Sequence, residues 1–187
     1  MNNRLHRSTA FDGQPPADGK SLRPSGACIR TAHAIPLTVK KEEHMSENNK
    51  ALVCRLLEEC VNQGNFSSVD QHVGADYVYR EPTVGERRGR SAFRELIAMY
   101  RNAIPDVKIT VEQQVAEGDH VLTRWVATGT HRGELFGAAG TGKSLRVEGM
   151  LLSRVVNGKL VENVEIYDTL GMLQQLGIVT AALAKAA

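Results

Sequence analysis

Residues 144–168 read SLRVEGMLLSRVVNGKLVENVEIYD, and they decide the fold class. Asn157-Gly158 is the strongest short hairpin signal in the chain, because both residues tolerate the positive φ angles of a tight turn. The apolar residues on either side of it fit two antiparallel strands. Upstream, the same patterning predicts two more strands, at 107–116 and 120–130, joined by the turn Glu117-Gly118-Asp119.

The part of the chain before these strands has helical periodicity. We expect a helix that Ser46 caps and Gly64 ends, a short helix from Ser67 to about Val73, and a third from Ser91 to Pro105. A brief strand at Tyr77–Tyr79 lies between the last two helices. Helices followed by hairpin-linked strands predict an α+β fold, with a curved antiparallel sheet wrapped on three N-terminal helices.

Composition excludes several classes of protein. The chain has 187 residues, of which 42% are hydrophobic and 24% charged, as in an ordinary globular domain. No apolar run is long enough to span a bilayer, so no membrane partner is expected. Residues 45–187 have no basic surplus, which argues against a nucleic-acid partner. Three cysteines without metal-type spacing indicate reduced thiols and a cytoplasmic protein.

Residues 1–44 are interpreted as a disordered extension. They contain four of the six prolines and show no apolar periodicity. One alternative is a mitochondrial transit peptide. The other is that the natural protein starts at Met45, because Lys40–Glu43 can be encoded by purine-only codons, as a ribosome-binding site would be. We favour the second alternative, which gives one domain over residues 45–187, and the mass of the natively expressed protein tests it.

Residues 137–144, GAAGTGKS, match the phosphate-loop pattern G-x-x-x-x-G-K-[ST]. That loop needs a helix after it, whose N-terminus holds the phosphates. The residues that follow are typical of a strand instead. We therefore expect a glycine-rich connection between two antiparallel strands, and no nucleotide.

Six short segments, taken in order, resemble the SnoaL-like polyketide cyclases, or ester cyclases, of the nuclear transport factor two-like superfamily. The resemblance covers nearly all of residues 46–177. It implies a cone-shaped sheet around a closed apolar pocket and cofactor-free aldol closure of a polyketide ester, without a metal. The segments are NQG at 62–64, DYV at 76–78, GTHRGELFG at 129–137, TGK at 141–143, NGK at 157–159 and GMLQQLG at 171–177.

The resemblance also implies roles for single residues. The general acid/base of the characterised cyclases, an Asp, falls on Glu165. The His that assists it falls on Leu151, and a pocket Gln falls on Gly149. Tyr79 and Val61 fall on other positions that line the pocket. The carboxylate is thus kept with a longer side chain, while the two polar partners are absent.

The turn at Asn157-Gly158 allows two registers. A two-residue turn pairs Val156 with Lys159 and places Leu151 and Glu165 on opposite faces of the sheet. A three-residue loop pairs Val155 with Lys159 instead. The family interpretation needs the second register, in which one face holds Gly149, Leu151, Ser153, Val161, Asn163, Glu165 and Tyr167.

Three further residues are candidates. His131 is expected either to stabilise an oxyanion at the pocket mouth or to make local hydrogen bonds. Asp168 is expected either to take part in catalysis or to cap the helical turn at Thr169. Trp125, the single tryptophan, is a candidate for substrate binding, for the core or for a subunit interface.

Two functions remain open at this point. The first is an enzyme for proton transfer on a small hydrophobic carbonyl compound, of the aldol cyclase or isomerase type. The second is a non-catalytic module of the same fold that binds a small ligand or dimerises. The fold usually forms homodimers through the outer face of its sheet, so we expect a homodimer.

Overall fold

The computed structural model describes residues 37–179, with side chains described from Glu42 onward. All of these residues belong to one compact unit. The predictions for residues 1–36, including most of the proposed extension, lie outside the described residues. Among the helices described, none is both long and apolar enough to cross a membrane.

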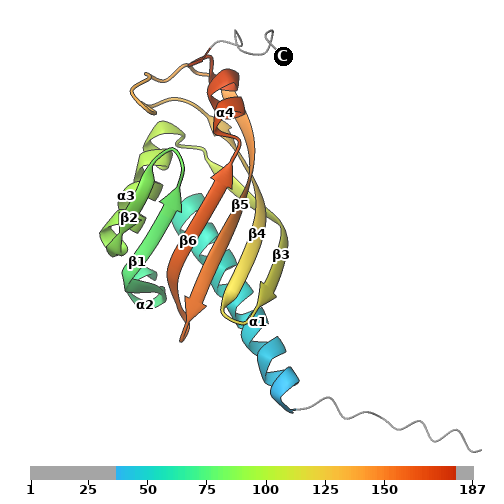
Figure 1. The fold of residues 1–187 in the computed structure, drawn as a ribbon. Coiled ribbons are helices and arrows are strands. Elements are labelled where there is room, and N and C mark those ends of the chain that lie inside the picture. Colours follow the sequence, from blue (N-terminus) through green and yellow to red (C-terminus); the bar gives the residue numbers. More distant parts are fainter. Residues whose placement is uncertain (1–36, 180–187) are drawn as a thin grey trace, which may run out of the picture. The chain divides into compact units, whose positions relative to one another are not determined.

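A six-stranded sheet forms the body of the domain (Figure 1). Its spatial order is β2-β1-β6-β5-β4-β3, and it stays open. Neighbouring strands are antiparallel except β1 and β6, which run parallel. The predicted curved sheet is confirmed, but it is not wholly antiparallel. The strands are β1 (Val73–Glu81), β2 (Gly85–Arg88), β3 (Lys108–Glu117), β4 (His120–Thr130), β5 (Ser144–Val156) and β6 (Lys159–Tyr167).

The helices pack on one face and at one end of this sheet. Helix α1 (Leu37–Leu56) lies along β3 and β4 and continues into a π-helix, η1 (Leu57–Asn62). Helix α3 (Gly89–Ala103) covers β1 and carries an apolar stripe, and the single turn α2 (Val69–His72) precedes β1. Helix α4 (Thr169–Leu176) closes the end of the sheet beside β5 (Figure 1).

Helix α1 begins earlier than the sequence predicted. It starts at Leu37 rather than at a cap on Ser46, so residues 37–44 are helical. Lys40–Glu43 are good helix formers, and they extend the helix although the described side chains of Glu42 and Glu43 are exposed. Gly64 ends the helical run as expected, with a left-handed φ of 68°.

The β5–β6 hairpin does not have the predicted three-residue loop, but it still reaches the facing that this loop would have produced. The turn is the two-residue kind, because Val156 pairs with Lys159 and both turn residues have positive φ. Val155 still pairs with Leu160, but Arg154 pairs with Glu162, so Val161 is an extra residue without a partner on β5. This β-bulge shifts the register by one. Leu151 therefore lies opposite Glu165, as the family interpretation requires.

The bulge also corrects one detail of that prediction. Leu160, rather than Val161, faces the interior together with Asn163, Glu165 and Tyr167. The core lies between this concave face and the helices, in two clusters of buried side chains. Residues of both clusters line a cavity between the helices and the concave face of the sheet.

Candidate active site

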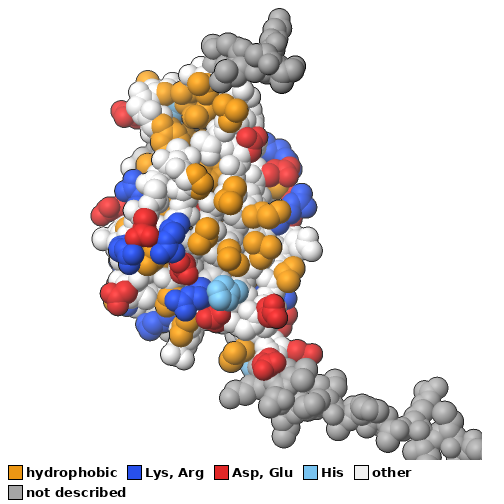
Figure 2. Space-filling view, in the orientation of Figure 1, with side chains coloured by type: hydrophobic (Ala, Val, Ile, Leu, Met, Phe, Trp, Pro, Cys, Tyr) orange, Lys and Arg blue, Asp and Glu red, His pale blue; other side chains and the backbone are white. Residues whose placement is uncertain are grey.

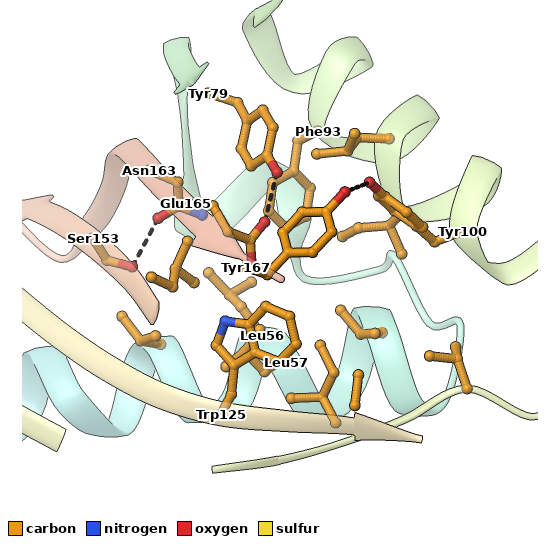
Figure 3. A pocket seen from close by; sticks show the side chains of 18 of the residues that line it. Leu56, Leu57, Tyr79, Phe93, Tyr100, Trp125, Ser153, Asn163, Glu165 and Tyr167 are labelled. Carbon is orange, nitrogen blue, oxygen red and sulfur yellow. Dashed lines mark hydrogen bonds between the residues drawn. The ribbon is translucent and has the colours of Figure 1, made fainter. Parts of the chain in front are cut away.

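The cavity lies between helices α1 and α3 and the concave face of the sheet, and has a volume of about 130 Å³. Figure 3 shows side chains from helices and strands converging on it. Most of its wall is aliphatic or aromatic. Polar atoms enter it from a small group of side chains, nearly all on the sheet: Tyr77, Tyr79, Tyr100, Trp125, Ser153, Asn163, Glu165 and Tyr167.

Glu165 carries the only carboxylate among the described residues that line the cavity. The bulge in β6 turns its side chain inward, beside β1. Tyr79 on β1 donates a hydrogen bond from its hydroxyl to Glu165 Oε2, with an O···O distance of 2.5 Å (Figure 3). Part of the Glu165 surface remains accessible because it faces the cavity, while protein atoms enclose the carboxylate on its other sides.

Burial raises the pKa of Glu165 to about 7. Apolar surroundings disfavour the charged carboxylate, and this effect is larger than the opposing effect of the Tyr79 hydrogen bond. The negative charge of Glu81 adds to the rise. Glu81 is itself buried, and its carboxylate accepts from the backbone N–H groups of Thr83 and Val84 at 2.8 and 2.9 Å. A carboxyl group with a pKa near neutrality can accept and return a proton at physiological pH.

Trp125 forms the floor of the cavity next to Glu165. It lies on β4, directly opposite Gly149 on β5. A Cβ atom at position 149 would lie 2.4 Å from Cζ2 of the indole and 2.8 Å from Cβ of Tyr167. Gly149 is therefore needed for space rather than for backbone conformation, and the indole occupies the place where a side chain at position 149 would lie.

The indole Nε1–H of Trp125 is buried and has no hydrogen-bond partner within the described residues. A buried donor left unpaired costs about 1–3 kcal/mol. The indole N–H lies near enough to Glu165 to lower the pKa of that carboxyl slightly, although the contact does not have hydrogen-bond geometry.

Two further polar pairs line the cavity. The hydroxyls of Tyr100 and Tyr167 lie 2.8 Å apart, and Ser153 Oγ donates to Asn163 Oδ1 at 2.7 Å (Figure 3). Sequence reasoning did not name Tyr100 as a site residue. The signal was present, because Tyr100 lies one helical turn after Leu96 and Ile97 on the apolar stripe of α3.

The structure places five of the eight candidate residues on the cavity wall: Glu165, Tyr79, Val61, Leu151 and Trp125. Leu151 lies directly across from Glu165. The side chain at the position where the resemblance implies an assisting His therefore lies next to the carboxylate, and it is apolar. Gly149 lies beneath the Trp125 ring and does not line the cavity itself.

His131 and Asp168 do not line the cavity. His131 is fully buried in the β4–β5 connection, where its Nδ1 accepts from the backbone N–H of Thr141 at 3.3 Å. Asp168 is exposed and caps α4 by accepting from the backbone N–H of Gly171 at 2.8 Å. For both residues the structure favours the local role over the catalytic one.

The phosphate-loop pattern lies in the connection between β4 and β5. Ser144 begins strand β5, and no helix follows the loop. The N-terminal helix dipole that a nucleotide phosphate would need is missing at this place. Among the described residues, no group of three or more His, Cys, Asp or Glu side chains is arranged to hold a metal ion.

Known proteins share this fold and sequence pattern. Residues 51–176 match the SnoaL-like polyketide cyclase family. The chain belongs to this family. It is 30% identical over 120 residues to the nogalonic acid methyl ester cyclase of Streptomyces nogalater, a match that covers 62% of this chain and 88% of that protein.

Solved structures of SnoaL-like and related proteins agree with the fold. IdmH of Streptomyces antibioticus, a candidate polyketide cyclase, is 31% identical, with a TM-score of 0.61 over 69% of this chain and 98% of that one. AclR of Streptomyces galilaeus, a candidate hydroxylase, is 27% identical, with a TM-score of 0.63 over 72% and 99%. Similar chains thus carry different assigned reactions, so the reaction of this SnoaL-like protein has to be argued from its own site.

Proposed function

We propose that this chain is a cofactor-free enzyme that removes a proton from the carbon next to a carbonyl group of a small hydrophobic compound. Family membership indicates small-molecule cyclase or isomerase chemistry. The observation that supports the proposal is one buried carboxylate with a pKa near 7, facing an otherwise apolar cavity.

Glu165 acts as the base in this proposal. Its Oε2 is held by the Tyr79 hydroxyl, which leaves Oε1 for the substrate. Oε1 takes the proton, the C–H bond breaks, and its electron pair moves to the carbonyl oxygen to form an enolate. In a cyclase the enolate carbon then attacks a second carbonyl group, forming the new C–C bond. In an isomerase Glu165 returns the proton to a different carbon.

Leu151 limits which side chains can carry the proton. A His at this position would share the proton with the carboxylate, whereas Leu151 cannot. Glu165 therefore both takes and returns the proton. A pKa of about 7 suits both steps, because the neutral and charged forms are equally populated at that pH.

Two probes test the proposal without knowledge of the natural substrate. One is deuterium exchange of the α-hydrogens of 2-tetralone in D₂O, followed by NMR. The other is elimination of 5-nitrobenzisoxazole, in which a base takes the C3 proton and the N–O bond breaks to give a coloured phenolate. We expect both rates to rise with pH through about 7 and then level off, because only ionised Glu165 is a base. Rates no higher than those with an equal concentration of acetate would contradict the proposal.

One observation favours a second candidate, a module that binds a ligand without turning it over. Both polar positions of the cyclases are apolar here, with Leu151 facing Glu165 and the Trp125 ring above Gly149. For such a module, apolar ketones should raise the melting temperature while neither probe reacts.

We also propose that the protein forms a homodimer through the outer face of the sheet. Hydrophobic side chains gather there over β4, β5 and β6 (Figure 2). Ile166 is 64% exposed and Met150, its cross-strand neighbour, is 52% exposed. Apolar patches of this kind mark protein interfaces. We call this surface the outer patch; it consists of Val115, Leu122, Met150, Leu152 and Ile166.

The substitution Leu152→Arg tests the dimer. Leu152 lies in the middle of the outer patch, opposite Leu122, so a charge there should be buried without a partner in a dimer. We expect wild-type protein to elute as a dimer, and the variant as a monomer, in size-exclusion chromatography with light scattering. Leu170→Arg, at a leucine on α4 that is also exposed (53% against 39% for Leu152), is the matched control and should stay dimeric. A monomeric wild type would contradict the proposal.

A further inference from the structure

We propose that Trp125 binds the carbonyl oxygen of the ligand through its indole Nε1–H, beside the carboxylate that takes the proton. This assigns the site's ligand class: a compact apolar molecule with an acidic C–H on the carbon next to its carbonyl group. The fate of the proton rests on the function proposed above, but the binding of the oxygen does not.

The first argument is the state of the donor. Trp125 is 5% exposed, lines the cavity, and has an Nε1–H without a partner among the described residues. Buried donors are almost always paired in folded proteins. A donor left unpaired in the wall of a cavity is therefore best explained by an acceptor that arrives with the ligand.

The second argument is how the ring is held. Trp125 faces Gly149 across β4 and β5, and any side chain at position 149 would overlap the ring. Tyr167, the partner of Gly149 on β6, also lies next to the ring, with the ring centroids 6.2 Å apart. The indole is fixed before a ligand enters, which is what an effective donor to a developing negative charge requires.

The third argument is the position of the donor relative to the base. The indole ring and the Glu165 carboxylate face the same space in Figure 3. Glu165 Oε2 is already occupied by Tyr79. When the carbonyl oxygen accepts from Nε1–H, the carbon next to the carbonyl group is directed toward Glu165. When the proton leaves, negative charge grows on the oxygen that Trp125 holds, and the N–H···O bond strengthens.

This arrangement also accounts for the polar residues that the family pattern lost. With glycine at position 149, the Trp125 ring fills the space that a side chain there would occupy. The indole N–H enters the cavity close to position 149, where the family resemblance implies a Gln. The donor is thus kept, but it comes from the neighbouring strand.

The chain contains a single tryptophan, so the indole proton can be followed directly. In protein labelled with ¹⁵N, one indole N–H signal is expected. We expect 2-tetralone to move this signal downfield, as a hydrogen bond to oxygen does. Tetralin, the matched hydrocarbon without the oxygen, should bind in the same cavity and leave the proton shift nearly unchanged. Equal shifts with the two ligands would overturn the proposal.

The variant Trp125→Phe keeps an aromatic ring above Gly149 and removes the donor. We expect the preference for 2-tetralone over tetralin, measured by calorimetry, to fall about tenfold, with the affinity for tetralin unchanged. The rate of α-hydrogen exchange should fall roughly 100-fold. If the variant does not fold, the NMR comparison on the wild type still decides the question.

Two outcomes separate this inference from the proposed function. A tetralone-specific indole shift without any exchange supports the oxygen site and contradicts the proton transfer. Glu165-dependent exchange that survives in Trp125→Phe, with an unchanged ketone preference, overturns the inference and leaves the proposed function standing. The inference is also overturned if Trp125→Phe changes only the pH midpoint of α-hydrogen exchange, because Trp125 would then act through Glu165.

Discussion

Replacing Glu165 with Gln should reduce proton abstraction from both probes by about 10²–10⁴-fold, the usual contribution of a general base. Gln has nearly the same shape and still accepts a hydrogen bond from Tyr79, but it cannot take a proton. The loss of kcat should be largest above pH 7, where wild-type Glu165 is ionised, and the inflection near pH 7 should disappear. The measurement is the pH–rate profile of 5-nitrobenzisoxazole elimination.

Glu165→Asp is the matched control, because it restores the residue type of the characterised cyclases. It keeps the charge but draws the carboxylate back by one carbon–carbon bond. A displacement of that order can cost about 100-fold in rate. We expect the Asp variant to fall between wild type and Gln. If Glu165→Gln keeps the wild-type rate, another group is the base, and the proposed mechanism is wrong.

The second large effect is on stability. The pKa of Glu165 is raised from 4.5 to about 7 in the folded protein. The folded state therefore holds its proton more tightly than the unfolded chain. This contribution is fully present below pH 4.5 and is lost as the pH rises through about 7. A shift of this size corresponds to about 3 kcal/mol of unfolding free energy.

Gln at position 165 carries no charge at any pH, so the variant lacks this loss. Above pH 8 we expect Glu165→Gln to be more stable than wild type by up to about 3 kcal/mol. Below pH 4.5 the two proteins should differ little. Urea unfolding of both proteins from pH 5 to pH 9 measures the difference, in which the contributions of other groups cancel. A constant difference across this range would show that Glu165 has an ordinary pKa.

The strands were predictable because their signals are local. Asn157-Gly158 fixes a tight turn, and alternation around Trp125 fixes the strand before it. The start of α1 was not predictable from Ser46, because a good cap residue can also lie inside a helix when helix formers precede it. The four-residue strand β2 was missed because GERR has no apolar alternation, and pairing with β1 stabilises it instead.

The candidate site was only partly predictable. Glu165 and Tyr79 were identified from the family resemblance, and the structure brings them within hydrogen-bond distance. His131 and Asp168 were proposed on residue type, which does not reveal whether a side chain faces a cavity or a local backbone group. The role of Trp125 depends on its fit to Gly149, a contact between strands that no local pattern encodes.

The extra residue in β6 has a consequence for how such a site can change. The unpaired Val161 determines which face of the sheet each later side chain of β6 lies on. If Val161 instead paired regularly with Arg154, the bulge would be lost and every later side chain of β6 would move to the opposite face of the sheet. Ile166 would then face the cavity, and the Glu165 carboxylate would lie among the hydrophobic side chains of the outer patch. The bulge, and not the turn alone, therefore decides whether the carboxylate faces the cavity.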